Sequence, residues 1–289
     1  MNLRIKMRYL LFFLLALLYF PILSQAQEPI SLYGYSNGDF PFSKIDANRP
    51  ILTVFALGRK ATGAAVIICS GGSYGRRANQ EEGLPAAKLF AKNGITTFLL
   101  DYRLPNGHDS IPFADAQASI RYVRKNARKY HIHKDKIGIM GFSAGGHLAA
   151  TVTTHFKEHF DNGGSAVSAR PDFAVLVYPV ISMEDNLTHN GSRNNLLGRS
   201  PTEDEKNKFS NELQVEDETP PVYIVHAIDD PVVKIDNTLL FIAALRQHRV
   251  PVETFIYAQG GHGFGVNNKT VQVQWTVPCL HWINKITTK

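Results

Sequence analysis

Residues 141–145 read Gly-Phe-Ser-Ala-Gly, so that a serine stands between two nearby glycines. A serine hydroxyl that attacks a carbonyl carbon projects from a sharp turn between a strand and a helix, where bulky neighbours would collide. The context fits this requirement, because 136–140 is a short, mainly apolar run and 146–152 has the composition of a helix. We therefore predict that Ser143 is a nucleophile.

A serine nucleophile needs a histidine base and a carboxylate that orients the base. Asp229 and Asp230 follow the apolar run 222–227, and His262 lies among glycines after the run 252–257. We assign Asp230 as the acid because it precedes the Pro-Val-Val segment that starts the next turn; Asp229 is the alternative. Among eleven histidines, only His262 stands at the required place in the order serine, acid, histidine.

The negative oxygen that forms during acyl transfer needs hydrogen-bond donors, often backbone N–H groups. One donor is expected from Ala144, at the start of the helix that follows the serine. The other is expected from the glycine-rich loop 71–74, which follows the apolar strand 64–69. We choose the N–H of Ser73 for this second donor, with Gly72 as the alternative.

The remaining histidines near these motifs have simpler interpretations. His147, His155 and His226 are expected to be packing or hydrogen-bonded side chains. No group of His, Cys, Asp and Glu has the spacing of metal ligands, and acyl transfer by a serine requires no cofactor. Neither a metal nor a cofactor is therefore expected.

Apolar runs typical of buried strands alternate with helical segments along the chain. Strands are predicted at 51–57, 64–69, 95–100, 136–140, 173–178, 222–227 and 252–257, after an irregular lead-in at 30–50. Helices are predicted at 84–92, 112–130, 146–152, 235–248 and 270–286, and a helix start at Thr202. This alternation predicts an α/β fold: a mostly parallel, doubly wound sheet with helices on both faces and no large cap domain.

The first 26 residues have the composition of a secretory signal peptide. Basic residues precede an uncharged apolar run at 10–20, and Ser24 and Ala26 supply small residues for cleavage after Ala26. A membrane anchor is the alternative, but the run is shorter than the ~20 residues of a bilayer span. We expect a secreted or periplasmic protein, free of the membrane after cleavage, with one domain over 27–289.

Charge and cysteine content narrow the class of protein further. The net charge of +6 includes three basic residues of the leader, and no basic stripe with interleaved aromatics is present. A nucleic-acid partner is therefore not expected. Cys69 and Cys279 are the only cysteines. Because Cys69 ends an apolar strand, a buried free thiol is the favoured state and a disulfide the alternative.

As a set, these motifs resemble the acetyl xylan esterase-like branch of the α/β-hydrolases. The resemblance is carried by 69–74, Glu82-Gly83, 101–105, 141–149, 196–198, 219–221, 226–233 and 260–265. The family usually has glycine at the position of Ser73, but a backbone donor survives the exchange. The resemblance implies an α/β-hydrolase fold and deacetylation of plant polysaccharide or oligosaccharide, such as xylan or xylo-oligosaccharides; composition and spacing indicate only a serine acyl hydrolase.

Several other functions remain open at this point. A general short-chain carboxylesterase or a feruloyl esterase uses the same residues. A serine peptidase of this type usually carries a large extra domain, for which about 263 residues leave no room. A lipase needs an apolar lid, whereas 181–219 is polar. An inactive binding module would lack one of the three residues, and none is missing.

Overall fold

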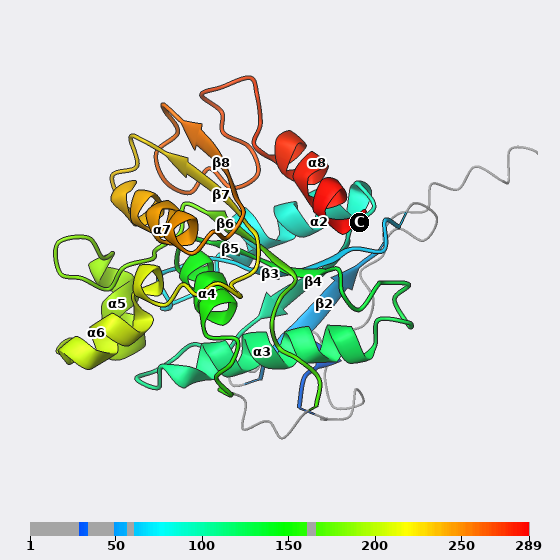
Figure 1. Cartoon of the computed structure of the whole chain (residues 1–289), viewed down its shortest axis with the longest axis horizontal. Coiled ribbons are helices and arrows are strands. Elements are labelled where there is room, and N and C mark those ends of the chain that lie inside the picture. Colours follow the sequence, from blue (N-terminus) through cyan, green and yellow to red (C-terminus); the bar gives the residue numbers. More distant parts are fainter. Residues whose placement is uncertain (1–28, 34–48, 57–60, 161–165, 289) are drawn as a thin grey trace, which may run out of the picture.

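The computed structural model describes residues 29–33, 49–56, 61–160 and 166–288; the predicted signal peptide lies outside them. The described chain forms an eight-stranded sheet with helices packed on both faces (Figure 1). This arrangement confirms the predicted α/β class and the mostly parallel, doubly wound sheet. Within these ranges no helix combines the length and apolar character needed to cross a bilayer.

The strands follow the apolar runs of the sequence closely. They are β1 (Ile30–Ser31), β2 (Ile51–Phe55), β3 (Ala65–Cys69), β4 (Thr96–Asp101), β5 (Ile137–Phe142), β6 (Phe173–Val177), β7 (Val222–Ala227) and β8 (Val252–Tyr257). Their order in the sheet is β1-β2-β4-β3-β5-β6-β7-β8. β2 pairs antiparallel with both β1 and β4, and the other five pairings are parallel. β3, β5 and β6 are buried along their whole length, which explains why their sequences are continuously apolar rather than alternating.

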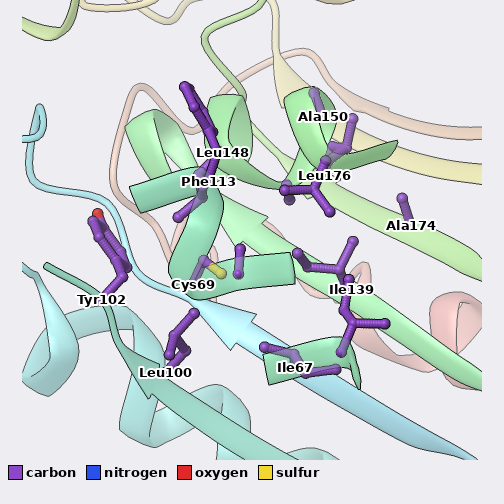
Figure 2. Packing of buried hydrophobic residues seen from close by; sticks show 14 of the residues in the cluster. Ile67, Cys69, Leu100, Tyr102, Phe113, Ile139, Leu148, Ala150, Ala174 and Leu176 are labelled. Atoms are coloured by element: carbon purple, nitrogen blue, oxygen red, sulfur yellow. The ribbon is translucent and has the colours of Figure 1, made fainter. Parts of the chain in front are cut away.

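Two layers of helices cover the sheet. They are α2 (Leu84–Lys92), α3 (Ser110–Lys125), α4 (Ser143–Thr154), α5 (Asn190–Leu197), α6 (Glu203–Phe209), α7 (Asp236–Gln247) and α8 (Thr276–Thr287). Side chains of α3, α4 and α7 share one buried cluster with the sheet, and those of α2 and α8 share the cluster on the other face. Figure 2 shows part of the first cluster, which includes Leu148 of α4, Phe113 of α3, Ile67 of β3 and Ile139 of β5.

The order of the strands determines where a ligand fits. The chain runs from β3 to β4 on one side and then crosses to β5 on the other side of β3. In open α/β sheets the crevice beyond the carboxyl ends of the strands at such a reversal is the usual ligand site. The loops that follow β3 and β5 are those that carry Ser73 and Ser143.

The structure differs from the sequence prediction in five places. Residues 30–31 pair with β2 instead of being irregular. The helix expected at 112–130 is α3, which ends at Lys125, and that expected at 270–286 is α8, which starts at Thr276. The later start of α8 has a local cause: the side chains of Asn268 and Gln274 hydrogen-bond the backbone of 268–271 and hold this stretch as a turn. The helix α5 and a π-helical turn, η2 (Asn79–Gly83), were not predicted at all.

Candidate active site

Ser143 lies at the junction of β5 and α4 in the left-handed region, with φ of +52°. A non-glycine residue in this region costs of order 1–3 kcal/mol, so the surrounding packing must impose it. A Cβ atom at Gly141 would collide with the carbonyl of Gly145, and one at Gly145 with the carbonyls of Cys69 and Ser70. The two glycines therefore let α4 pack directly against the ends of β3 and β5.

The structure brings the three predicted side chains together. His262 Nε2 lies 2.9 Å from Ser143 Oγ, and His262 Nδ1 lies 2.7 Å from Asp230 Oδ2. A carboxylate only accepts hydrogen bonds, so Nδ1 carries the proton and Nε2 accepts from the serine hydroxyl. The residues come from the loops after β5, β7 and β8, whose carboxyl ends meet at one edge of the sheet.

The carboxylate of Asp230 is buried and fully hydrogen-bonded. Its Oδ1 accepts from the backbone N–H groups of Val232 and Val233 at 2.8 and 2.9 Å, and its Oδ2 also faces His226 Nε2 at 3.2 Å. Burial alone would raise the pKa of Asp230, but the hydrogen bonds from His226 and His262 outweigh it and hold that pKa well below its usual value. Asp230 is thus ionised when His262 becomes protonated.

Asp229, the alternative acid, has a different position. It is exposed, and its Oδ1 accepts from the N–H of Gly261 at 2.8 Å. It therefore caps the loop that carries His262 without reaching the imidazole.

His226 contributes more to the site than its sequence context indicated. Its Nε2 faces Asp230 and also the carbonyl of Val233, 3.0 Å away, so this nitrogen carries the proton. Its Nδ1 then accepts from the hydroxyl of Thr238 at 2.7 Å. Its place at the end of β7, four residues before Asp230, is the sequence signal that would have revealed this support of the acid.

The loop after β3 carries the backbone N–H groups that the sequence predicts as oxyanion donors. Gly72 and Ser73 have φ values of +117° and +56°, and their N–H groups have no hydrogen-bond partner within the described ranges. The Ser73 carbonyl accepts from Asn195 Nδ2 of α5 at 2.8 Å, which ties the loop to α5. Ala144 is the second residue of α4, so no earlier helical carbonyl accepts its N–H. Free backbone N–H groups of this kind are the donors that an oxyanion requires during acyl transfer.

His147 holds this loop through a hydrogen bond with Tyr74. Tyr74 OH donates to His147 Nδ1 at 2.9 Å, and His147 Nε2 donates to the carbonyl of Phe209 at 2.8 Å. Burial lowers the pKa of His147 to about 4, although the Phe209 carbonyl opposes this effect. The expectation of a hydrogen-bonded histidine at this position is confirmed.

The polar segment before β7 forms one side of the site. His189 is the N-cap residue of α5, and its Nδ1 accepts from the N–H of Ser192 at 3.2 Å. Burial and the charge of His262 lower the pKa of His189, whereas the charge of Asp230 opposes this effect. Asn195 of α5 contacts the loop after β3 through the Ser73 carbonyl.

No group of three or more His, Cys, Asp or Glu side chains suited to a metal occurs within the ranges that the structure describes. Cys69 and Cys279 are both free and buried.

Known proteins match this chain at the levels of family, sequence and structure. Residues 56–245 match the family model described as BD-FAE. An acetylxylan esterase of Xylanibacter ruminicola is 37% identical over 208 residues, which are 71% of this chain and 42% of that protein. Endo-1,4-beta-xylanase B of Butyrivibrio fibrisolvens is 36% identical over 217 residues, 73% of this chain and 34% of that protein. This chain thus spans about two fifths or less of these two relatives.

The crystal structure of an acetyl ester-xyloside bifunctional hydrolase from Caldicellulosiruptor lactoaceticus has the same fold. The TM-score is 0.80 at 36% identity, over 92% of this chain and 99% of that chain. The predicted α/β-hydrolase fold is thereby confirmed.

The buried state of His147 predicts how stability depends on pH. The unfolded chain binds a proton at an ordinary histidine pKa, about 6.5, and the folded protein only near 4. The free energy of unfolding therefore falls as the pH falls through this window. In His147→Gln we expect this fall, measured by urea unfolding at about pH 7 and about pH 4, to be smaller by up to about 3 kcal/mol.

The matched control is His108→Gln, which removes an exposed imidazole. It should leave the pH dependence of the wild type unchanged. An equal pH dependence in His147→Gln and wild type would contradict the role assigned to the buried imidazole.

Proposed function

The chain belongs to the BD-FAE family, and from this premise we propose that it is a serine esterase with Ser143 as its nucleophile. The proposal rests on the continuous hydrogen-bonded series Ser143–His262–Asp230. Family membership and the acetylxylan esterase relative also confirm the resemblance predicted from the motifs.

In the proposed mechanism, His262 Nε2 takes the proton of Ser143 while Oγ forms a bond to the ester carbonyl carbon. The carbonyl oxygen becomes an oxyanion, which the N–H groups of Ala144 and Ser73 stabilise, with Gly72 as the alternative second donor. His262 then gives its proton to the departing alcohol oxygen as the carbon–oxygen bond breaks. Water, activated by the same imidazole, releases the acid and restores the serine.

Asp230 acts through His262 in both half-reactions. Its ionised, buried carboxylate holds the Nδ1–H tautomer and balances the positive charge of the imidazolium. His226 and the two backbone N–H groups on Oδ1 keep this carboxylate in position.

The substrate that we propose is an O-acetyl group on xylan or xylo-oligosaccharides. The names of the relatives support this choice, since one is an acetylxylan esterase and the neighbouring structure an acetyl ester-xyloside hydrolase. The polar side chains of α5, which contacts the loop after β3 through Asn195, suit a sugar better than a long acyl chain. A general short-chain carboxylesterase or a feruloyl esterase is the alternative.

Replacement of the nucleophile tests the reaction class. We expect Ser143→Ala to lower kcat for p-nitrophenyl acetate by more than about a thousandfold, because no acyl-enzyme forms without Oγ. The control is Ser168→Ala, an exposed serine outside the site. Undiminished hydrolysis by Ser143→Ala would refute the assignment.

A panel of esters tests the substrate class. We expect kcat/KM for acetate release from acetylated xylo-oligosaccharide to exceed that for p-nitrophenyl octanoate by more than about tenfold, a difference of about 1.4 kcal/mol in transition-state binding. Comparable values for both would favour a general carboxylesterase. Faster release of ferulate from feruloylated oligosaccharide would favour a feruloyl esterase.

We also propose that the protein is exported, on the basis of the basic and apolar leader that ends at Ala26. Expression of the full chain in a bacterium should give a protein outside the cytoplasm whose sequence begins at Gln27. N-terminal sequencing of the periplasmic and medium fractions measures this. An uncleaved protein in the membrane fraction would instead support an anchor.

A further inference from the structure

Glu82 is a buried acidic residue that the proposed mechanism does not use. It lies in η2, the π-helical turn between β3 and α2, and only 5% of its surface is exposed. π-helical turns are rare and are often found at functional sites. Burial of a carboxylate costs free energy unless hydrogen bonds satisfy both of its oxygens. The hydrogen-bond partners of Glu82 therefore indicate its role.

One oxygen of Glu82 holds the loop that carries the oxyanion donors. Oε2 accepts from the N–H of Gly71 at 2.6 Å, immediately before Gly72 and Ser73. A Cβ atom at Gly71 would lie 2.9 Å both from this oxygen and from Cβ of Ser143. Gly71 is thus enclosed between the carboxylate and the nucleophile, and a shift of Glu82 would move the donors relative to the serine.

The other oxygen reaches the loop that carries the histidine. Oε1 accepts from Tyr178 OH at 3.0 Å, and the same hydroxyl accepts from the N–H of Gly265 at 3.0 Å. The ring of Tyr178 lies against the imidazole of His262, with centroids 4.7 Å apart. Its φ of +37° is imposed by the surrounding structure. A single series, Gly71–Glu82–Tyr178–Gly265, therefore connects the two loops.

The charge of Glu82 acts on the same imidazole. Burial raises the pKa of Glu82, whereas the hydrogen bonds from Gly71 and Tyr178 and the charge of His262 oppose that rise. Among the described residues, two titratable groups besides Glu82 and Tyr178 interact with His262: Asp230, which pairs with it, and His189, whose charge would repel it. Glu81 also acts on Glu82, but it points outward and pairs with Arg76.

We propose that Glu82 is a positioning residue that holds the oxyanion loop and the histidine loop in one relative arrangement. Its carboxylate also supports the imidazolium that forms on His262 during acyl transfer. This inference rests on the proposed esterase function for its kinetic consequences, but the connection between the two loops stands on geometry alone.

The test compares Glu82→Gln with wild type and with Glu81→Gln, which removes the same charge at the exposed neighbouring position. We expect Glu82→Gln to lower kcat for p-nitrophenyl acetate by about tenfold to a hundredfold, because donors and base lose their alignment, and to change KM by less than about threefold. The acid limb of the pH profile of kcat/KM should shift to lower pH. The reason is that Glu82→Gln removes a negative charge that stabilises the protonated imidazole of His262. Glu81→Gln should change neither quantity.

Hydrogen exchange separates this inference from the proposed function, since it needs no activity. Backbone N–H groups of both loops, 71–75 and 261–265, should exchange faster in Glu82→Gln than in wild type and Glu81→Gln. An active wild type with unchanged kcat, pH profile and exchange in Glu82→Gln overturns the inference. An inactive wild type with faster exchange of both loops in Glu82→Gln overturns the esterase proposal and leaves the connection standing.

A second variant covers the case in which Glu82→Gln does not fold. Tyr178→Phe removes only the hydroxyl of the series and keeps the ring against His262. We expect faster exchange of 261–265 and a lower kcat in this variant. Wild-type exchange and kcat in Tyr178→Phe would contradict the connection, whatever the fate of Glu82→Gln.

Discussion

The tight turn between β5 and α4 is the constraint on which the rest of the site depends. Because Gly141 and Gly145 lack side chains, the first turn of α4 packs against the carbonyl groups that end β3. This contact forces Ser143 to a φ of +52° and brings its hydroxyl within reach of loops that follow three other strands. Packing of the buried apolar strands offsets the free-energy cost of this strain, since it fixes both ends of the turn.

The sequence was sufficient for the parts of the fold that depend on local pattern. The strands at 222–227 and 252–257 and the helix at 84–92 occur with the predicted bounds, because apolar runs and helix ends are encoded nearby. Ser143, Asp230 and His262 each follow a parallel strand, and neighbouring parallel strands end at the same edge of the sheet. Their convergence was therefore predictable from the sequence.

Features that depend on distant contacts were not predictable. The π-helical turn around Glu82 is stabilised by Gly71 and Tyr178, and the latter is far away in the sequence. The link from His226 to Asp230 appears only once β7 and the following loop are folded. The helix α5 has a polar sequence without an apolar period, and it is held in place by contacts such as that of Asn195 with the loop after β3.

In the proposed mechanism the oxyanion is bound by the main chain. The donors are the peptide N–H groups of Ala144 and Ser73, with Gly72 as the alternative, so a side chain at position 73 is not required. An alanine scan across the site would therefore detect the nucleophile, the base and the acid, and would pass over these donors. Only changes to the backbone itself, such as replacement of an amide by an ester linkage, would make their contribution visible.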